Sequence, residues 1–96
     1  MLFWVEFLPC RPDFFSTMTE AESRLMMGHL RSLERHQEEG RLEFAGRAAD
    51  ATHGLAIFDL PSQEALDAVL GENPAVKAGL LVPRSRPYSL PPPPKE

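Results

Sequence analysis

The sequence predicts an α+β domain whose elements follow the order strand, helix, strand, strand, helix, strand. Two segments with helical periodicity and recognisable start and stop signals alternate with short runs of β-branched, aromatic and aliphatic residues. The loop between the second and third of these runs is short, which predicts an antiparallel hairpin. This order is that of the split βαβ, or ferredoxin-like, fold with a four-stranded antiparallel sheet.

The chain has 96 residues and a formal net charge of -4, the size of one small domain. We expect residues 1–90 to form this domain and residues 91–96, PPPPKE, to be a disordered proline-rich tail. The net negative charge disfavours nucleic acid as a partner. The apolar start, MLFWVEFLP, is interrupted by Glu6 and is too short to span a membrane. We therefore expect a cytoplasmic protein with no membrane partner.

The first strand is predicted over residues 2–8, where successive side chains point to opposite faces. One face carries Phe3, Val5 and Phe7, and the other carries Leu2, Trp4, Glu6 and Leu8. Trp4 and Glu6 are candidates for contacts with a substrate.

The first helix has clear signals at both ends. Thr19 and Glu22 have the spacing of a capping box, in which each side chain satisfies the other residue's free backbone amide. The helix is predicted to run to about Glu39 and to stop at Gly40, which suits the left-handed position after a helix.

The hairpin is predicted over the two segments that follow. Residues 41–47 form its first strand, with Leu42 and Phe44 on one face, and residues 54–60 form its second strand. Residues 48–53 are the connecting turn.

The second helix is predicted to begin after Ser62, a natural N-cap, and to end at Gly71. Asn73 then caps one further short turn of helix, with Pro74 at its first position and Gly79 as its stop.

The last strand is predicted over residues 80–85. It contains Pro83, which cannot donate a hydrogen bond, so we expect this strand at an edge of the sheet. The two helices cover one face of the sheet and leave the other face bare and apolar in a monomer. Trp4 and Leu8 are candidates for that bare face, and a second subunit packed sheet to sheet would cover it.

His29 lies at the centre of the apolar stripe of the first helix, between Leu25 and Leu33. One interpretation is a packed histidine that is hydrogen-bonded to a carbonyl or a water molecule. The other is a general acid or base, because imidazole titrates near neutral pH. His36 lies nearer the helix end, where we expect it to interact with the C-terminal carbonyls.

The residues predict neither a metal site nor a cofactor site. His29 and His36 are too far apart for the usual pair on adjacent turns, and no paired cysteines exist. No glycine-rich phosphate loop and no nucleophile elbow is present in the sequence. Cys10 has no partner for an intramolecular disulfide, and we expect it to be a structural or loop thiol.

Several segments resemble known families. GHLRSLERHQEEGRLEFAGR (28–47) closely resembles the helix-to-strand segment of YCII-related proteins, and ENPAVKAGL (72–80) resembles their later Asp-Pro segment. AIFDLPSQEALDAVL (56–70) is equally similar to muconolactone isomerases, as is the opening MLFWV. The resemblance implies a dimeric α/β barrel, in which the sheets of a homodimer form a barrel and each subunit has a cleft.

The resemblance also implies a site. In YCII-related proteins a helix histidine and the aspartate of the Asp-Pro pair form a proposed active pair, and these positions are His29 and Asn73 here. Asn73 does not titrate, but it can fix the orientation or tautomer of the ring through a hydrogen bond, or it can simply cap the helix. Arg47 stands where isomerase-like relatives carry an arginine. It can hold a carboxylate, or it can be a solvated residue at a strand end.

The function that the resemblance implies is cofactor-free isomerisation or elimination on a lactone, an enol or an aromatic-pathway acid. His29 would move a proton or polarise an oxygen, and Asn73 would orient its ring. Arg47, Trp4 and Glu6 would contact the substrate. The alternative is a non-catalytic dimeric module that binds a ligand or a protein. In either case we expect a homodimer and no metal.

Overall fold

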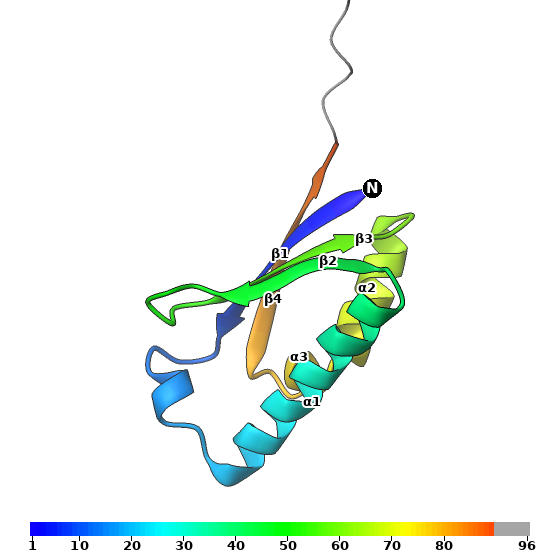
Figure 1. Cartoon of the computed structure of the whole chain (residues 1–96). Coiled ribbons are helices and arrows are strands. Elements are labelled where there is room, and N and C mark those ends of the chain that lie inside the picture. The colour runs from blue at the N-terminus through cyan, green and yellow to red at the C-terminus, as the bar shows by residue number, and fades with distance from the viewer. Residues whose placement is uncertain (90–96) are drawn as a thin grey trace, which may run out of the picture.

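The computed structural model describes residues 1–89, so the predicted tail at 91–96 lies outside the described residues (Figure 1). In chain order the elements are β1 (Leu2–Pro9), the short 3-10 helix η1 (Phe14–Ser16), α1 (Glu20–Glu38), β2 (Leu42–Arg47), β3 (Gly54–Asp59), α2 (Gln63–Glu72), α3 (Pro74–Lys77) and β4 (Leu81–Tyr88). The predicted βαββαβ order is confirmed.

The four strands form one sheet in the order β2-β3-β1-β4, and every neighbouring pair is antiparallel. β4 lies at an edge, as its proline predicted. It continues beyond the predicted end at Ser85 and includes Pro87, because an outer strand can accommodate residues that donate no hydrogen bond on its open side.

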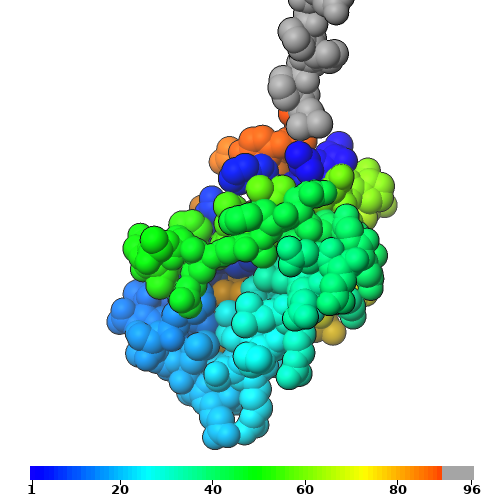
Figure 2. Space-filling model, in the orientation of Figure 1, coloured from blue at the N-terminus to red at the C-terminus, as the bar shows by residue number. Residues whose placement is uncertain are grey.

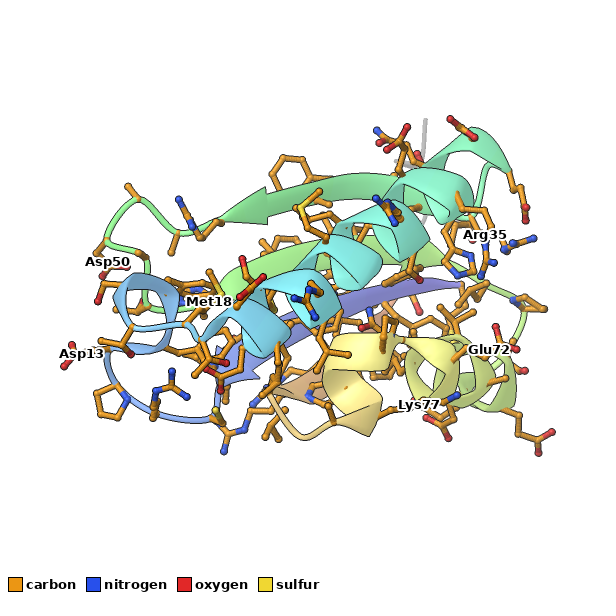
Figure 3. All side chains as sticks on the ribbon, turned by 90° about the horizontal axis from the view of Figure 1, so that it is seen from below. Asp13, Met18, Arg35, Asp50, Glu72 and Lys77 are labelled. Carbon is orange, nitrogen blue, oxygen red and sulfur yellow. The ribbon has the colours of Figure 1, made fainter. Side chains whose placement is uncertain are left out.

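The helices all lie on one face of the sheet (Figure 3). At one end of this helical layer, Arg35 of α1 and Glu72 of α2 approach to 3.9 Å. Among the described residues, no helix combines the length and the apolar character that a membrane crossing requires.

The core lies between the sheet and the helices. Phe3, Val5 and Phe7 of β1 are fully buried there, as the alternation along this strand predicted. The remaining core residues come from the neighbouring elements: Phe14, Leu42, Ala56, Phe58, Leu60, Leu66, Leu70, Ala75, Leu80 and Leu81.

The predicted helix starts are confirmed. The backbone amide of Glu22 donates to Thr19 Oγ1 at 3.1 Å, and the amide of Thr19 donates to Glu22 Oε1 at 2.9 Å, so the capping box is complete. Ser62 Oγ accepts from the amide of Ala65 at 3.1 Å.

The predicted end of α2 at Gly71 is wrong by one residue. The helix passes through Gly71 and ends at Glu72, because the next residue, Asn73, precedes Pro74. A residue before proline is sterically disfavoured in the helical region, so this proline ends the helix where the glycine does not.

The prediction that Leu42 and Phe44 share a face is also wrong. Leu42 pairs with Phe58, whereas Phe44 pairs with Ile57, so the register shifts by one residue between them. Such a β-bulge places an extra residue in one strand and reverses the alternation of faces. Leu42 is therefore buried under the helices, and Phe44 is exposed on the open face.

His36 is buried and does not interact with the helix end as predicted. Its Nδ1 accepts a hydrogen bond from Arg41 Nε at 3.0 Å, and its ring meets Phe58 edge-on. Its Nε2 is buried and has no hydrogen-bond partner within residues 1–89.

Candidate functional site

A cavity of about 490 Å³ opens between α1 and the end of the sheet formed by the β2–β3 hairpin. Figure 1 shows why it is there: α1 lies close to β2 near its own C-terminus and diverges from the hairpin toward its N-terminus. In Figure 2 the surface is hollowed between the green hairpin and the cyan helix. Most of the lining is apolar: Phe7, Phe15, Met18, Met26, Met27, Leu30, Leu33, Ala45, Gly46, Gly54 and Leu81, with Ser23, His29 and Arg47 as the polar side chains.

His29 lies on the inner wall of this cavity. Its side of α1 faces the sheet, so the residue is only 6% exposed, and its ring meets the ring of Phe7 edge-on with centroids 4.9 Å apart. Burial lowers the pKa of the His29 imidazole, because a charged ring loses hydration there. The neutral form of His29 is therefore the favoured one.

Asn73 contacts His29 directly, although 44 positions separate them: its Nδ2 lies 2.8 Å from His29 Nδ1. Asn73 is 3% exposed and lies at the junction of α2 and α3. Its Oδ1 accepts hydrogen bonds from the amides of Ala75 at 3.0 Å and Val76 at 3.4 Å, which caps α3. The two alternatives for Asn73, capping the helix and holding the histidine, therefore occur together.

The approach of α3 to α1 depends on Gly28. A Cβ atom built at this position would lie 2.7 Å from Cγ of Pro74, closer than van der Waals contact allows. Because Gly28 has no side chain, the start of α3 can lie against α1 at this point. Gly28 directly precedes His29 in the chain, so the close approach of the two helices brings Asn73 within hydrogen-bonding distance of the imidazole.

Arg47 lies at the end of β2 on the side of the sheet that faces the helices, and it lines the same cavity as His29. Its guanidinium carbon is 5.4 Å from the ring centroid of Phe15. This aromatic contact restricts the arginine at the rim, where its planar fork of donors remains exposed.

Trp4 and Glu6 lie on the opposite face of the sheet from His29. They line an open depression of about 550 Å³ together with residues of β4, and the ring of Trp4 lies 5.5 Å from that of Tyr88. Of the five predicted site residues, the structure brings His29, Asn73 and Arg47 together and separates Trp4 and Glu6 from them by the thickness of the sheet.

Methionines and Phe15 also line the cavity, and they are not among the site residues predicted from the sequence. Met18, Met26 and Met27 are three of the four methionines in the chain, and all three lie before or within the first half of α1. This clustering is a usable signal, because flexible thioether side chains are common where a surface adapts to a ligand. Within residues 1–89, no three His, Cys, Asp or Glu side chains are grouped as a metal ion would need.

Comparisons with known proteins agree with this fold. The family model described as the YCII-related domain matches residues 2–85. A solved muconolactone isomerase has a TM-score of 0.77 at 26% identity, over 96% of this chain and 92% of that chain. No relative was found among curated protein sequences.

A second solved structure is 5-chloro-2-hydroxyhydroquinone dehydrochlorinase from Burkholderia phenoliruptrix AC1100 in complex with 2,5-dihydroxybenzoquinone. Its TM-score is 0.70 at 19% identity, over 93% of this chain and 94% of that chain. The likeness to these two structures confirms the predicted fold class.

Proposed function

The chain belongs to the YCII-related domain family, and from this premise we propose that it is a small-molecule enzyme. It performs cofactor-free isomerisation or elimination on a lactone, an enol or an aromatic-pathway acid. The observation that carries this proposal is the cavity of about 490 Å³, with an apolar lining, His29 on its wall and Arg47 at its rim. A concave apolar site of this size with a few convergent polar groups is typical of small-molecule binding.

The lining suggests how a substrate is held. The guanidinium of Arg47 pairs with a carboxylate or another anionic oxygen at the rim. The methionines and Phe15 contact the flat or aliphatic body of the molecule. His29 then lies against the part of the substrate that is deepest in the cavity, where it polarises an oxygen or moves a proton.

The structural relatives support this choice of chemistry. By their names, one is an isomerase of a lactone and the other a dehydrochlorinase of a substituted hydroquinone. Both reaction types involve the movement of protons and the stabilisation of charge on oxygen, which a histidine and an arginine can provide.

The proposal is tested by titrating the protein with muconolactone and with 2,5-dihydroxybenzoquinone, using calorimetry and thermal unfolding. We expect at least one of them to raise the midpoint of unfolding, because a ligand that binds only the folded state stabilises it. We expect Arg47→Gln to weaken that binding about tenfold to a hundredfold, since a charge-assisted hydrogen bond contributes about 1.5–3 kcal/mol.

Arg84→Gln is the matched control, because Arg84 is an arginine of the open face and does not line the cavity. Its binding constant is expected to equal that of the wild type. If Arg84→Gln weakened binding and Arg47→Gln did not, the ligand would bind the open face and the assignment of the cavity would be wrong.

Turnover separates the enzyme from the alternative, a non-catalytic binding module. Muconolactone bound by the protein is followed by proton NMR in deuterium oxide, where isomerisation or exchange of a carbon-bound proton is visible. Conversion that His29→Gln abolishes supports the enzyme. Saturable binding without conversion or exchange supports the module.

Membership of the family also suggests a quaternary structure, and we propose that a second copy of the chain covers the open face of the sheet. Four large hydrophobic side chains on this face are 41–51% exposed: Trp4, Phe44, Val82 and Tyr88. Exposed apolar side chains gathered on one face of a sheet, here beside the charged residues Glu6, Arg84 and Arg86, are typical of an interface. In this dimer Trp4 and Glu6 face the space between the two sheets and do not contact a substrate held in the cavity with His29 and Arg47.

Light scattering after size exclusion tests the dimer. We expect the wild type to have twice the mass of one chain and Trp4→Glu to have the mass of a single chain, because a carboxylate is costly to bury in an apolar interface. Met27→Glu is the control, since Met27 is similarly exposed but lies on α1. A monomeric wild type at concentrations up to the millimolar range would contradict the dimer.

A further inference from the structure

The orientation of the Asn73 amide is fixed by the first turn of α3. Its Oδ1 accepts hydrogen bonds from two backbone amides, those of Ala75 and Val76. A flipped amide would place its NH₂ group against these two N–H donors and leave all of them unpaired, which is costly for buried groups. The NH₂ group is therefore the end of Asn73 that faces His29.

This orientation determines the tautomer of His29. The Nδ2 atom of Asn73 has hydrogens to donate and no free acceptor, so His29 Nδ1, 2.8 Å away, must accept. A neutral imidazole carries one proton, and this proton is then on Nε2. Burial keeps the ring neutral, and an imidazolium would in addition place its Nδ1–H against the NH₂ group of the amide.

The other ring nitrogen is available to a ligand. His29 Nε2 has no hydrogen-bond partner among residues 1–89, and unlike Nε2 of His36 it is not sealed from the surface. His29 lines the cavity, and the edge-on contact with Phe7 fixes the plane of its ring. The ring contacts Phe7 of β1 and Asn73, the N-cap of α3, neither of which titrates, and Arg47 is the other titratable residue among the described residues that line the cavity.

We propose that Asn73 holds His29 as the Nε2–H tautomer, so that His29 acts on a ligand in the cavity as a hydrogen-bond donor to an oxygen and not as a proton acceptor. This inference rests on the proposed function, because it assumes that the cavity binds a small molecule. It narrows that function: of the two roles open to His29, it retains polarisation of an oxygen and removes general-base catalysis. A proton that the reaction removes from carbon then passes to water at the open mouth of the cavity.

The inference also narrows the class of ligand. Arg47 is the only charged side chain among the described residues that line the cavity, and its guanidinium has only donors. Two fixed donors, His29 Nε2–H and the Arg47 guanidinium, require a ligand with two acceptor oxygens. The ligand is therefore an oxygen-rich anion, such as an enolate or a keto acid, whose developing negative charge the two donors stabilise.

The first experiment measures the tautomer in the ligand-free protein. Long-range proton–nitrogen correlation NMR distinguishes a protonated ring nitrogen from an unprotonated one. His36→Gln and His53→Gln assign the signals, since the chain has three histidines. We expect His29 at pH 7.5 to carry its proton on Nε2. A proton on Nδ1 would overturn the inference and leave the proposed function intact.

A second experiment tests whether Asn73 is what fixes the tautomer of His29. In Asn73→Asp one carboxylate oxygen still caps α3, while the other replaces the NH₂ group and accepts from His29 Nδ1–H. We expect the proton to move to Nδ1 and the pKa of His29 to rise by about 1–3 units, as beside a negative charge. Lys77→Gln is the control, an exposed residue of α3. An unchanged tautomer in Asn73→Asp would also overturn the inference.

Ligand binding completes the test and separates the two proposals. With 2,5-dihydroxybenzoquinone as the probe, and at a pH above the raised pKa of His29, we expect Asn73→Asp to bind at least about tenfold more weakly, because the neutral Nδ1–H ring has no Nε2–H donor. A wild type with the Nε2–H tautomer that binds neither this probe nor muconolactone refutes the proposed function. Equal binding by wild type and Asn73→Asp refutes the donor role of His29.

Discussion

Asn73→Ala is expected to lower the free energy of unfolding by about 2–4 kcal/mol, the sum of a lost N-cap and an unpaired buried acceptor. The cap disappears because alanine has no oxygen for the amides of Ala75 and Val76. At the same time Nδ1 of His29 loses its buried partner. Urea unfolding followed by circular dichroism gives the difference.

The comparison with Asn73→Asp separates the two contributions. Aspartate keeps the cap and also offers His29 a partner, so we expect it to retain most of the stability that alanine loses. If Asn73→Ala were within about 0.5 kcal/mol of the wild type, the size of an ordinary surface substitution, the junction of α2 and α3 would not depend on this side chain.

Gly28→Ala is expected to destabilise the fold by about 1–3 kcal/mol, the usual cost of overpacking. The added Cβ would lie 2.7 Å from Cγ of Pro74, so α3 must move away from α1. This movement takes Asn73 with it and lengthens its contact with His29. The loss is expected even though alanine is the better helix former by about 1 kcal/mol.

Gly71→Ala is the matched control, since Gly71 also lies in a helix and a Cβ there meets nothing within 4 Å. We expect this substitution to raise the free energy of unfolding by up to about 1 kcal/mol through helix propensity alone. Denaturant unfolding measures both variants, and the NMR signals of His29 report its contact with Asn73. Equal stabilisation by the two alanines would show that α1 and α3 are not tightly packed.

The element order and the helix starts followed from the sequence because their causes are local. Thr19 and Glu22 are three positions apart, and their reciprocal hydrogen bonds need no other part of the chain. The same holds for Ser62 at α2 and Asn73 at α3. The alternation along β1 identified its buried face for a similar reason, since the period of a strand is fixed.

Predictions failed where a local preference competed with another constraint. Alternation predicts the wrong face for Phe44, because a bulge shifts the β2–β3 register by one residue and alternation alone does not reveal a bulge. Glycine favours a helix end at Gly71, but α2 continues to Glu72 and ends before Pro74. The position of His36 predicts an interaction with the carbonyls at the end of α1, whereas its ring packs against Phe58 in the core.

By itself, the sequence determined the fold class, the capped helices and the candidates His29, Asn73 and Arg47, because residue type, spacing and family resemblance are properties of the chain alone. Only the tertiary structure decided which candidates share a cavity and placed Trp4 and Glu6 on the other face of the sheet. It alone also decided that the Asn73 amide donates to His29. The direction of that hydrogen bond depends on how α3 packs against α1, and a contact between residues 44 positions apart exists only in the folded chain.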